Sequence, residues 1–187
     1  MVFFALASNG SAQFSWGVKG GVTLSRFSEE VGEQGIYTGF YGGLFGEYAF
    51  GRAFALQPEV LYSRYGGNLG NIMVGRNGDT RNRLDYLNVA LIGKVALMRG
   101  LTLDLGPEYA RLLVGKEITT WEDGGPPKKD DITYRMRAND FYVAMGFTYR
   151  ATRRLDVSVR YDLGLVKQDD AYGYKNNVIR IGAGFRF

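Results

Sequence analysis

The sequence predicts an all-β protein, an eight-stranded, antiparallel, up-and-down transmembrane β-barrel. Three observations lead to this fold class. Apolar and polar residues alternate with period two in eight successive segments. Glycine (27), tyrosine (13) and phenylalanine (12) are abundant while proline is scarce (4), which favours strands and turns. Short and long connections alternate between the segments, which is typical of outer-membrane barrels with short periplasmic turns and longer extracellular loops.

The 187 residues suit a single barrel domain, which we place at residues 13–187. Residues 1–12 combine a short apolar run with small residues ending in Gly10-Ser11-Ala12, and they resemble the cleavage end of a secretory signal peptide. The usual cationic start is missing, so we expect a remnant of a signal peptide there. The alternative is a flexible N-terminal arm. No window of about 18 consecutive apolar residues exists, which argues against a transmembrane helix.

Each expected strand has one apolar and one polar face, because side chains alternate along a strand. The strands are expected at about residues 14–26, 37–50, 54–65, 84–97, 101–115, 139–150, 155–166 and 179–187. Tight turns are expected near Gly51 and Arg99 and at residues 151–154. The long polar connections at residues 27–36, 66–83, 116–138 and 167–177 are expected to be loops. Tilted strands of this length suit a bilayer, which needs about 9–11 residues.

The polar faces carry charges of both signs, shared evenly among the strands. An eight-stranded barrel is only wide enough to be filled by side chains, and buried charges must neutralise one another. We therefore predict a charge network in the lumen, with Arg160 and Arg180 facing acidic partners. Its expected members are Lys19, Glu47, Glu59, Lys94, Asp104, Glu108, Arg160, Asp162, Arg180 and Arg186. The alternative places the apolar faces inside, which describes a soluble, lipocalin-like ligand-binding barrel.

Two Pro-Glu pairs, Pro58-Glu59 and Pro107-Glu108, interrupt expected strands. Proline lacks the donor for the strand ladder, and a closed barrel offers it no edge. One interpretation is a lumen site in which two carboxylates hold a cation or a proton. The other is a β-bulge at each proline, with each glutamate paired to a lysine or arginine.

Composition excludes several functions. The chain has no cysteine and no histidine, so it lacks the commonest metal ligands and the commonest general base. We expect no enzyme activity, no catalytic residues, no metal and no cofactor. The net charge of +4 is scattered without a basic run, which argues against nucleic acid as a partner. Eight strands are also too few for an open aqueous pore.

The C-terminal segment alternates apolar residues and ends on Phe185 and Phe187. This pattern is similar to the β-signal by which the outer-membrane assembly machinery recognises its clients. A simpler interpretation makes Phe187 the last residue of a lipid-facing aromatic girdle. Both interpretations are compatible.

The long loops contain the candidates for recognition, because binding residues concentrate on loops that a rigid scaffold presents. Arg76, Arg81 and Trp121 have the composition of recognition surfaces and are the expected contacts for a protein partner. The alternative is that the loops are merely solvated. Cations near the outer rim are also expected to meet the phosphates of lipopolysaccharide, namely Arg64, Arg83, Lys116, Arg135 and Arg137.

Several strand motifs resemble those of the PorT-like outer-membrane β-barrel proteins of Bacteroidetes. The motifs are "GVKGGVTLSRF" (17–27), "GFYGGLFGEYAF" (39–50), "FALQPEVLYSRYGG" (54–67), "LDYLNVALIGKVAL" (84–97), "LTLDLGPEYARLL" (101–113), "LDVSVRYDLGL" (155–165) and "IRIGAGFRF" (179–187). The resemblance implies a barrel in the bacterial outer membrane, surrounded by lipid and lipopolysaccharide. It implies no settled activity. We expect a structural or interaction role; the alternative is an accessory component of a secretion or envelope complex.

Overall fold

The computed structural model describes residues 13–28, 36–71, 78–121, 124–167 and 175–187. Their strands are β1 (Gln13–Ser28), β2 (Tyr37–Phe50), β3 (Phe54–Asn71), β4 (Gly78–Met98), β5 (Leu101–Trp121), β6 (Lys128–Asp131), β7 (Asn139–Arg150), β8 (Leu155–Lys167) and β9 (Lys175–Arg186). The expected signal remnant lies outside these ranges. No helix in the described part of the chain is long and apolar enough to cross a membrane.

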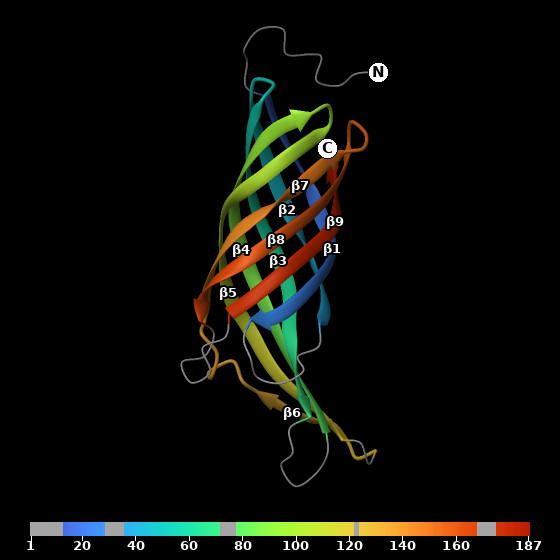
Figure 1. The fold of residues 1–187 in the computed structure, drawn as a ribbon, viewed down its shortest axis with the longest axis vertical. Coiled ribbons are helices and arrows are strands. Elements are labelled where there is room, and N and C mark those ends of the chain that lie inside the picture. The colour runs from blue at the N-terminus through green and yellow to red at the C-terminus, as the bar shows by residue number, and fades with distance from the viewer. Residues whose placement is uncertain (1–12, 29–35, 72–77, 122–123, 168–174) are drawn as a thin grey trace.

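Eight of these strands close into a ring, which confirms the predicted fold class. Strands β1 to β5 and β7 to β9 pair antiparallel with their neighbours in the chain, and β1 pairs with β9 to close the barrel. The strands wind obliquely around one axis (Figure 1). The turns after β2, β4 and β7 lie at the end of the barrel that carries the C-terminus, whereas β6 lies at the opposite end. We call these the turn end and the loop end.

Two of the turns depend on glycine. Gly51 (φ 74°) and Gly100 (φ 81°) adopt the left-handed conformation that other residues rarely take. They allow β2 to reverse into β3, and β4 into β5, within three residues or fewer. The tight turns predicted near Gly51 and Arg99 are thereby confirmed, and the third, at residues 151–154, joins β7 to β8.

The apolar faces of the strands point outwards and the polar faces point into the barrel. Leu44 on β2 and Val159 on β8 are 57% and 49% exposed, whereas Glu59 and Arg180 are 2% exposed. A band of exposed aliphatic and aromatic side chains therefore surrounds the barrel, as a lipid-facing surface requires. The lipocalin-like alternative is wrong, because it needs these apolar faces in the lumen.

Aromatic residues gather on the outer surface at the turn end. Phe14, Trp16, Phe54, Tyr149 and Phe187 are all more than half exposed there. The Trp16 and Phe187 rings lie 4.5 Å apart between their centroids, and the Phe187 amide donates to the Trp16 carbonyl at 3.0 Å. These contacts bridge the first and last strands, so part of the girdle covers the seam where the barrel closes.

The strands at the loop end are longer than the sequence predicts. β3 continues to Asn71, β4 begins at Gly78 and β5 continues to Trp121, so much of the expected loops at 66–83 and 116–138 is strand. The third loop also contains β6, whose residues 128–131 pair with residues 116–119 of β5. These extensions lack an apolar face, because beyond the membrane both faces of a strand can meet water.

The fourth expected loop is also shorter than predicted. β9 begins at Lys175, and Asn176 is fully buried with its side chain inside the barrel. The expectation of a loop up to residue 177 is therefore wrong. Asparagine is unusual in strands, so a prediction based on alternating apolar residues did not include these first residues of β9.

Candidate functional site

The lumen is filled by charged side chains from strands far apart in the sequence. All ten residues of the predicted network point into it, and each is at most 5% exposed apart from Lys19, whose side chain is 7% exposed. Together with Arg150 and Asp156, which were not among the predicted members, they form two clusters. The central cluster contains Lys19, Glu59, Glu108, Arg160, Asp162 and Arg180; the turn-side cluster contains Glu47, Lys94, Asp104, Arg150, Asp156 and Arg186.

Glu59 holds one half of the central cluster together. Arg160 donates to both Glu59 oxygens at 2.8 and 2.7 Å, and Lys19 Nζ donates at 2.8 Å. Gln57 adds a further hydrogen bond at 2.6 Å. Arg160 and Glu59 thus form a bidentate guanidinium–carboxylate pair, and Lys19 is a second cation on the same carboxylate. Such bidentate pairs are among the strongest side-chain contacts in proteins.

Glu108 holds the other half. Arg180 donates to both Glu108 oxygens at 2.6 Å, and Asn88 donates to the same carboxylate at 2.6 Å. Arg180 Nε lies 3.1 Å from Asp162 Oδ2, an ion pair without hydrogen-bond geometry, since neither atom has a hydrogen-bond partner. Arg180 also donates to the Tyr65 hydroxyl. Arg160 Nη1 lies 3.9 Å from Glu108 Oε2 and links the two halves.

Arg186 is the centre of the turn-side cluster. It donates to both oxygens of Glu47 at 2.8 Å and to Asp156 at 2.7 Å. Arg150 donates to Glu47 at 2.9 Å. Lys94 donates to Gln57 at 3.0 Å and joins this cluster to the central one.

Each cluster contains three cations and three anions, so each is neutral by itself. Isolated buried charges are very unfavourable, whereas paired and hydrogen-bonded charges are tolerated. The distribution explains how a lumen of this composition can be stable without a ligand. Across the residues that the structure places, no group of three or more acidic side chains is arranged to hold a metal ion.

Neither Pro-Glu pair forms a bulge. Strands β3 and β4 keep one register from Phe54 through Pro58 to Asn68, and β5 and β7 keep one register from Leu101 through Pro107 to Arg111. The predicted bulges are therefore wrong. Both prolines are exposed on the outer face, while the glutamates that follow them are the acceptors of the central cluster. Each carboxylate has its own arginine, which disfavours a shared site for a cation or proton.

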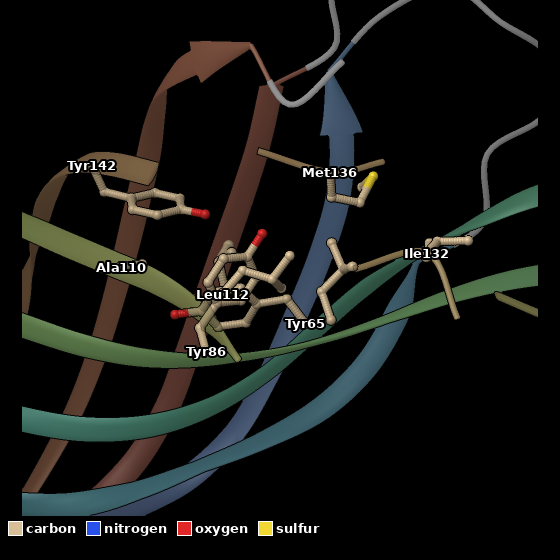
Figure 2. Packing of buried hydrophobic residues seen from close by; sticks show 9 residues of the cluster. Tyr65, Tyr86, Ala110, Leu112, Ile132, Met136 and Tyr142 are labelled. Atoms are coloured by element: carbon tan, nitrogen blue, oxygen red, sulfur yellow. The ribbon is translucent and has the colours of Figure 1, made fainter. Parts of the chain in front are cut away.

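The loop end of the lumen is closed by an apolar cluster, shown in Figure 2. It contains Tyr65, Leu84, Tyr86, Ala110, Leu112, Ile132, Met136, Tyr142 and Val178. Ile132 and Met136 come from the segment between β6 and β7, and both are buried beside barrel residues. The segment therefore places two apolar side chains in the mouth of the barrel. We call residues 132–138 the plug segment.

A cationic patch lies on the outer surface near the loop end. It consists of Arg64 on β3 and Arg83 on β4, which both contact Asp85, together with Lys116 on β5 opposite Arg83, and Arg81 two residues before Arg83 on β4. Asp85 accepts from Arg64 Nε at 2.7 Å and from Arg83 Nη2 at 2.8 Å. This shared carboxylate holds two guanidiniums close together. We call this group the outer patch.

Aromatic packing fixes one side of the outer patch. The Arg64 guanidinium lies 4.7 Å above the ring of Phe40, a half-exposed residue of the apolar band. The patch therefore begins where the lipid-facing surface ends, at the level expected for headgroups.

The residues predicted for recognition, Arg76, Arg81 and Trp121, do not lie together in a described loop. Arg81 and Trp121 belong to strands β4 and β5 rather than to loops, and Arg76 lies outside the described residues. Sequence reasoning missed Tyr65 and the plug segment. Tyr65 shares the inward parity of Glu59 on β3, which was the available signal. Nothing in the spacing of Ile132 and Met136 indicates that they enter the barrel.

Residues 7–169 match the family described as outer membrane protein beta-barrel domain. The chain belongs to this family. It is an outer-membrane β-barrel protein, and its location is the bacterial outer membrane. The match at this level identifies the broad family and not the PorT-like type.

Solved structures of bacterial barrels are similar in fold. Ail of Yersinia pestis in complex with sucrose octasulfate has a TM-score of 0.53 at 16% identity, with 94% of this chain and 99% of Ail covered. Neisserial surface protein A has a TM-score of 0.56 at 16% identity, with 95% and 99% covered. OprG of Pseudomonas aeruginosa has a TM-score of 0.51 at 14% identity, with 95% and 98% covered. No curated protein sequence matches the chain significantly.

Proposed function

We propose that this family member has a structural or interaction role and meets its partners at the surface of the loop end, which faces the outside of the cell. The filled lumen supports this proposal most strongly, because two neutral charge clusters and an apolar plug occupy the space that a channel would need. The absence of histidine and cysteine from the sequence also disfavours catalysis. The strand motifs support the PorT-like type as a finer proposal. An accessory role in a secretion complex would instead use the turn end.

A filled lumen should not conduct ions. The purified protein in a planar lipid bilayer is expected to give no current steps above those of a protein-free bilayer, because the central cluster blocks the path. A variant lacking residues 132–136 should also be silent, since the clusters remain in place without the plug segment. Discrete current steps from the complete protein would contradict the proposed role and favour a channel.

We also propose that the outer patch binds the phosphates of lipopolysaccharide. Arginine pairs bind phosphate through charge-assisted hydrogen bonds, and this patch adjoins the apolar band at headgroup level. The Ail complex with sucrose octasulfate, described as a heparin analogue, gives this fold a precedent for an anionic partner. We further propose that the outer-membrane machinery assembles the barrel through Phe185 and Phe187, and the variant Phe187→Asp is the test.

The double variant Arg64→Gln/Arg83→Gln should retain less lipopolysaccharide during purification in mild detergent. Charge-assisted hydrogen bonds contribute about 1.5–3 kcal/mol each, so a loss of roughly ten-fold or more in affinity is expected. Mass spectrometry of the purified barrel measures the retained lipid. The matched control is Arg153→Gln/Arg154→Gln, which removes two exposed cations at the turn end.

Binding to purified lipid A, with and without its phosphates, identifies the group that is recognised. The wild type should prefer the phosphorylated form and the double variant should not. Equal retention by both double variants would argue against the outer patch as a phosphate site.

A further inference from the structure

The plug segment exposes an aromatic side chain to solvent between two buried residues. Tyr134 is 83% exposed, more than any other large apolar side chain in the described ranges. Its neighbours two residues away on either side, Ile132 and Met136, are 3% and 8% exposed inside the barrel mouth (Figure 2). The buried pair anchors the segment while the residue between them faces outwards.

Three hydrogen bonds tie the segment to β5 and close a turn within it. The Ile132 amide donates to the Gly115 carbonyl at 3.0 Å, and the Arg135 amide donates to the Ile132 carbonyl at 2.9 Å. The Gly115 amide donates to Thr133 Oγ1 at 2.8 Å. A loop that is ordered before binding loses less conformational entropy when a partner arrives.

The charged groups near the segment are mostly cationic. Arg135 and Arg137 are exposed beside Tyr134, and Lys128 and Lys129 lie on β6, just before the plug segment. Three acidic residues lie among them: Glu117 on β5 opposite Asp130, and Asp130 and Asp131 on β6, which both have local partners. Asp130 pairs with Lys128 at 2.7 Å. Thr133 hydrogen-bonds to Asp131 and lowers the pKa of that carboxyl below its ordinary value.

We infer that residues 133–137 form a rigid binding epitope for a protein partner that presents acidic side chains around an apolar recess. This inference rests on the proposed function, because a partner outside the cell reaches the epitope only if the loop end faces outwards. Tyrosine and arginine are the residues that dominate protein interfaces when they are presented rigidly. The guanidinium forks suit carboxylates, and the tyrosine ring fills the recess.

A protein fits this epitope better than an acidic polysaccharide. The aromatic contact and the exposed guanidiniums are confined to a few consecutive residues, which matches the compact centre of a protein interface. A polyanionic chain would instead follow an extended row of cations, and its affinity would depend little on one tyrosine. The contribution of Tyr134 therefore distinguishes the two.

The test uses the complete protein in lipid nanodiscs and a random-peptide library displayed on phage. Selection is made for the wild type and against Tyr134→Ala/Arg135→Gln. Enriched peptides should combine Asp or Glu with apolar residues. Their affinity, measured by fluorescence anisotropy, should fall about ten-fold or more with either single variant, as expected for central interface residues. Tyr134→Phe should keep most of the affinity, and Arg153→Gln at the turn end should keep all of it.

Two outcomes would overturn the inference. One is the absence of acidic peptides that distinguish the wild type from the double variant. The other is binding of dextran sulfate, a polyanion probe, that needs Arg135 but not Tyr134, with no peptide enriched. Both substitutions are at exposed sites, so heat-dependent gel mobility should confirm that the variants are folded. If the peptides bind the purified protein but label cells only after permeabilisation, the epitope stands and the proposed orientation fails.

Discussion

The variant Glu59→Ala should lose about 3–5 kcal/mol of folding free energy, as expected when one partner of a buried ion pair is removed. Glu59 is 2% exposed and accepts from both Lys19 and Arg160. Without it, two cations stay in the lumen without their nearest carboxylate. Urea unfolding in lipid vesicles, followed by heat-dependent gel mobility, measures the loss.

Two control variants show whether burial is the cause. Asp130→Ala breaks an exposed ion pair with Lys128 and should leave the urea midpoint almost unchanged, because water screens such pairs. Glu59→Gln combined with Lys19→Met removes one charge of each sign and should recover part of the loss. If Glu59→Ala unfolded at the urea concentration of the wild type, the central cluster would not be a buried network.

The variant Phe187→Asp should strongly reduce the amount of folded barrel in the outer membrane of cells. The expected cause is loss of recognition by the assembly machinery rather than loss of stability. Phe187 lies at the turn-end rim, where a charged residue on the lipid face costs only about 0–1 kcal/mol. Fractionation of cells and quantification of the folded form measure the effect.

Phe54→Asp is the matched control, because Phe54 is an outward aromatic of the same rim with almost the same exposure, 60% against 61%. It should assemble nearly as well as the wild type. Both variants should refold equally well into lipid vesicles in the absence of the assembly machinery. Equal defects of the two variants in cells would leave Phe187 with its girdle role alone.

The sequence predicts which way each barrel residue faces, because strand side chains alternate and the lipid demands an apolar surface. The inward positions of Arg160 and Arg180 follow from this rule. Their individual partners do not follow, because the pair Arg160–Glu59 joins residues 101 positions apart across the lumen. Which of several inward carboxylates meets a given arginine depends on the tilt and stagger of the strands.

The sequence does not predict the structure beyond the membrane. The extensions of β3, β4 and β5 and the short β6 lack the apolar alternation on which the assignment depends. The plug segment was missed for a related reason. Two apolar residues four positions apart in a polar loop carry no strand or helix pattern, although here both enter the barrel.

The pairing of charges across the lumen has a consequence for how the strands align during folding. A slip of one residue between neighbouring strands turns the inward charges of the slipped strand towards lipid, which makes that alignment unfavourable in the membrane. A slip of two residues leaves each side chain on its original face, so the lipid does not disfavour it. It would, however, separate Glu59 from Arg160 and Arg186 from Glu47, and leave buried charges unpaired. The ion pairs therefore favour one alignment of the strands over the others that would keep the same faces towards lipid and lumen.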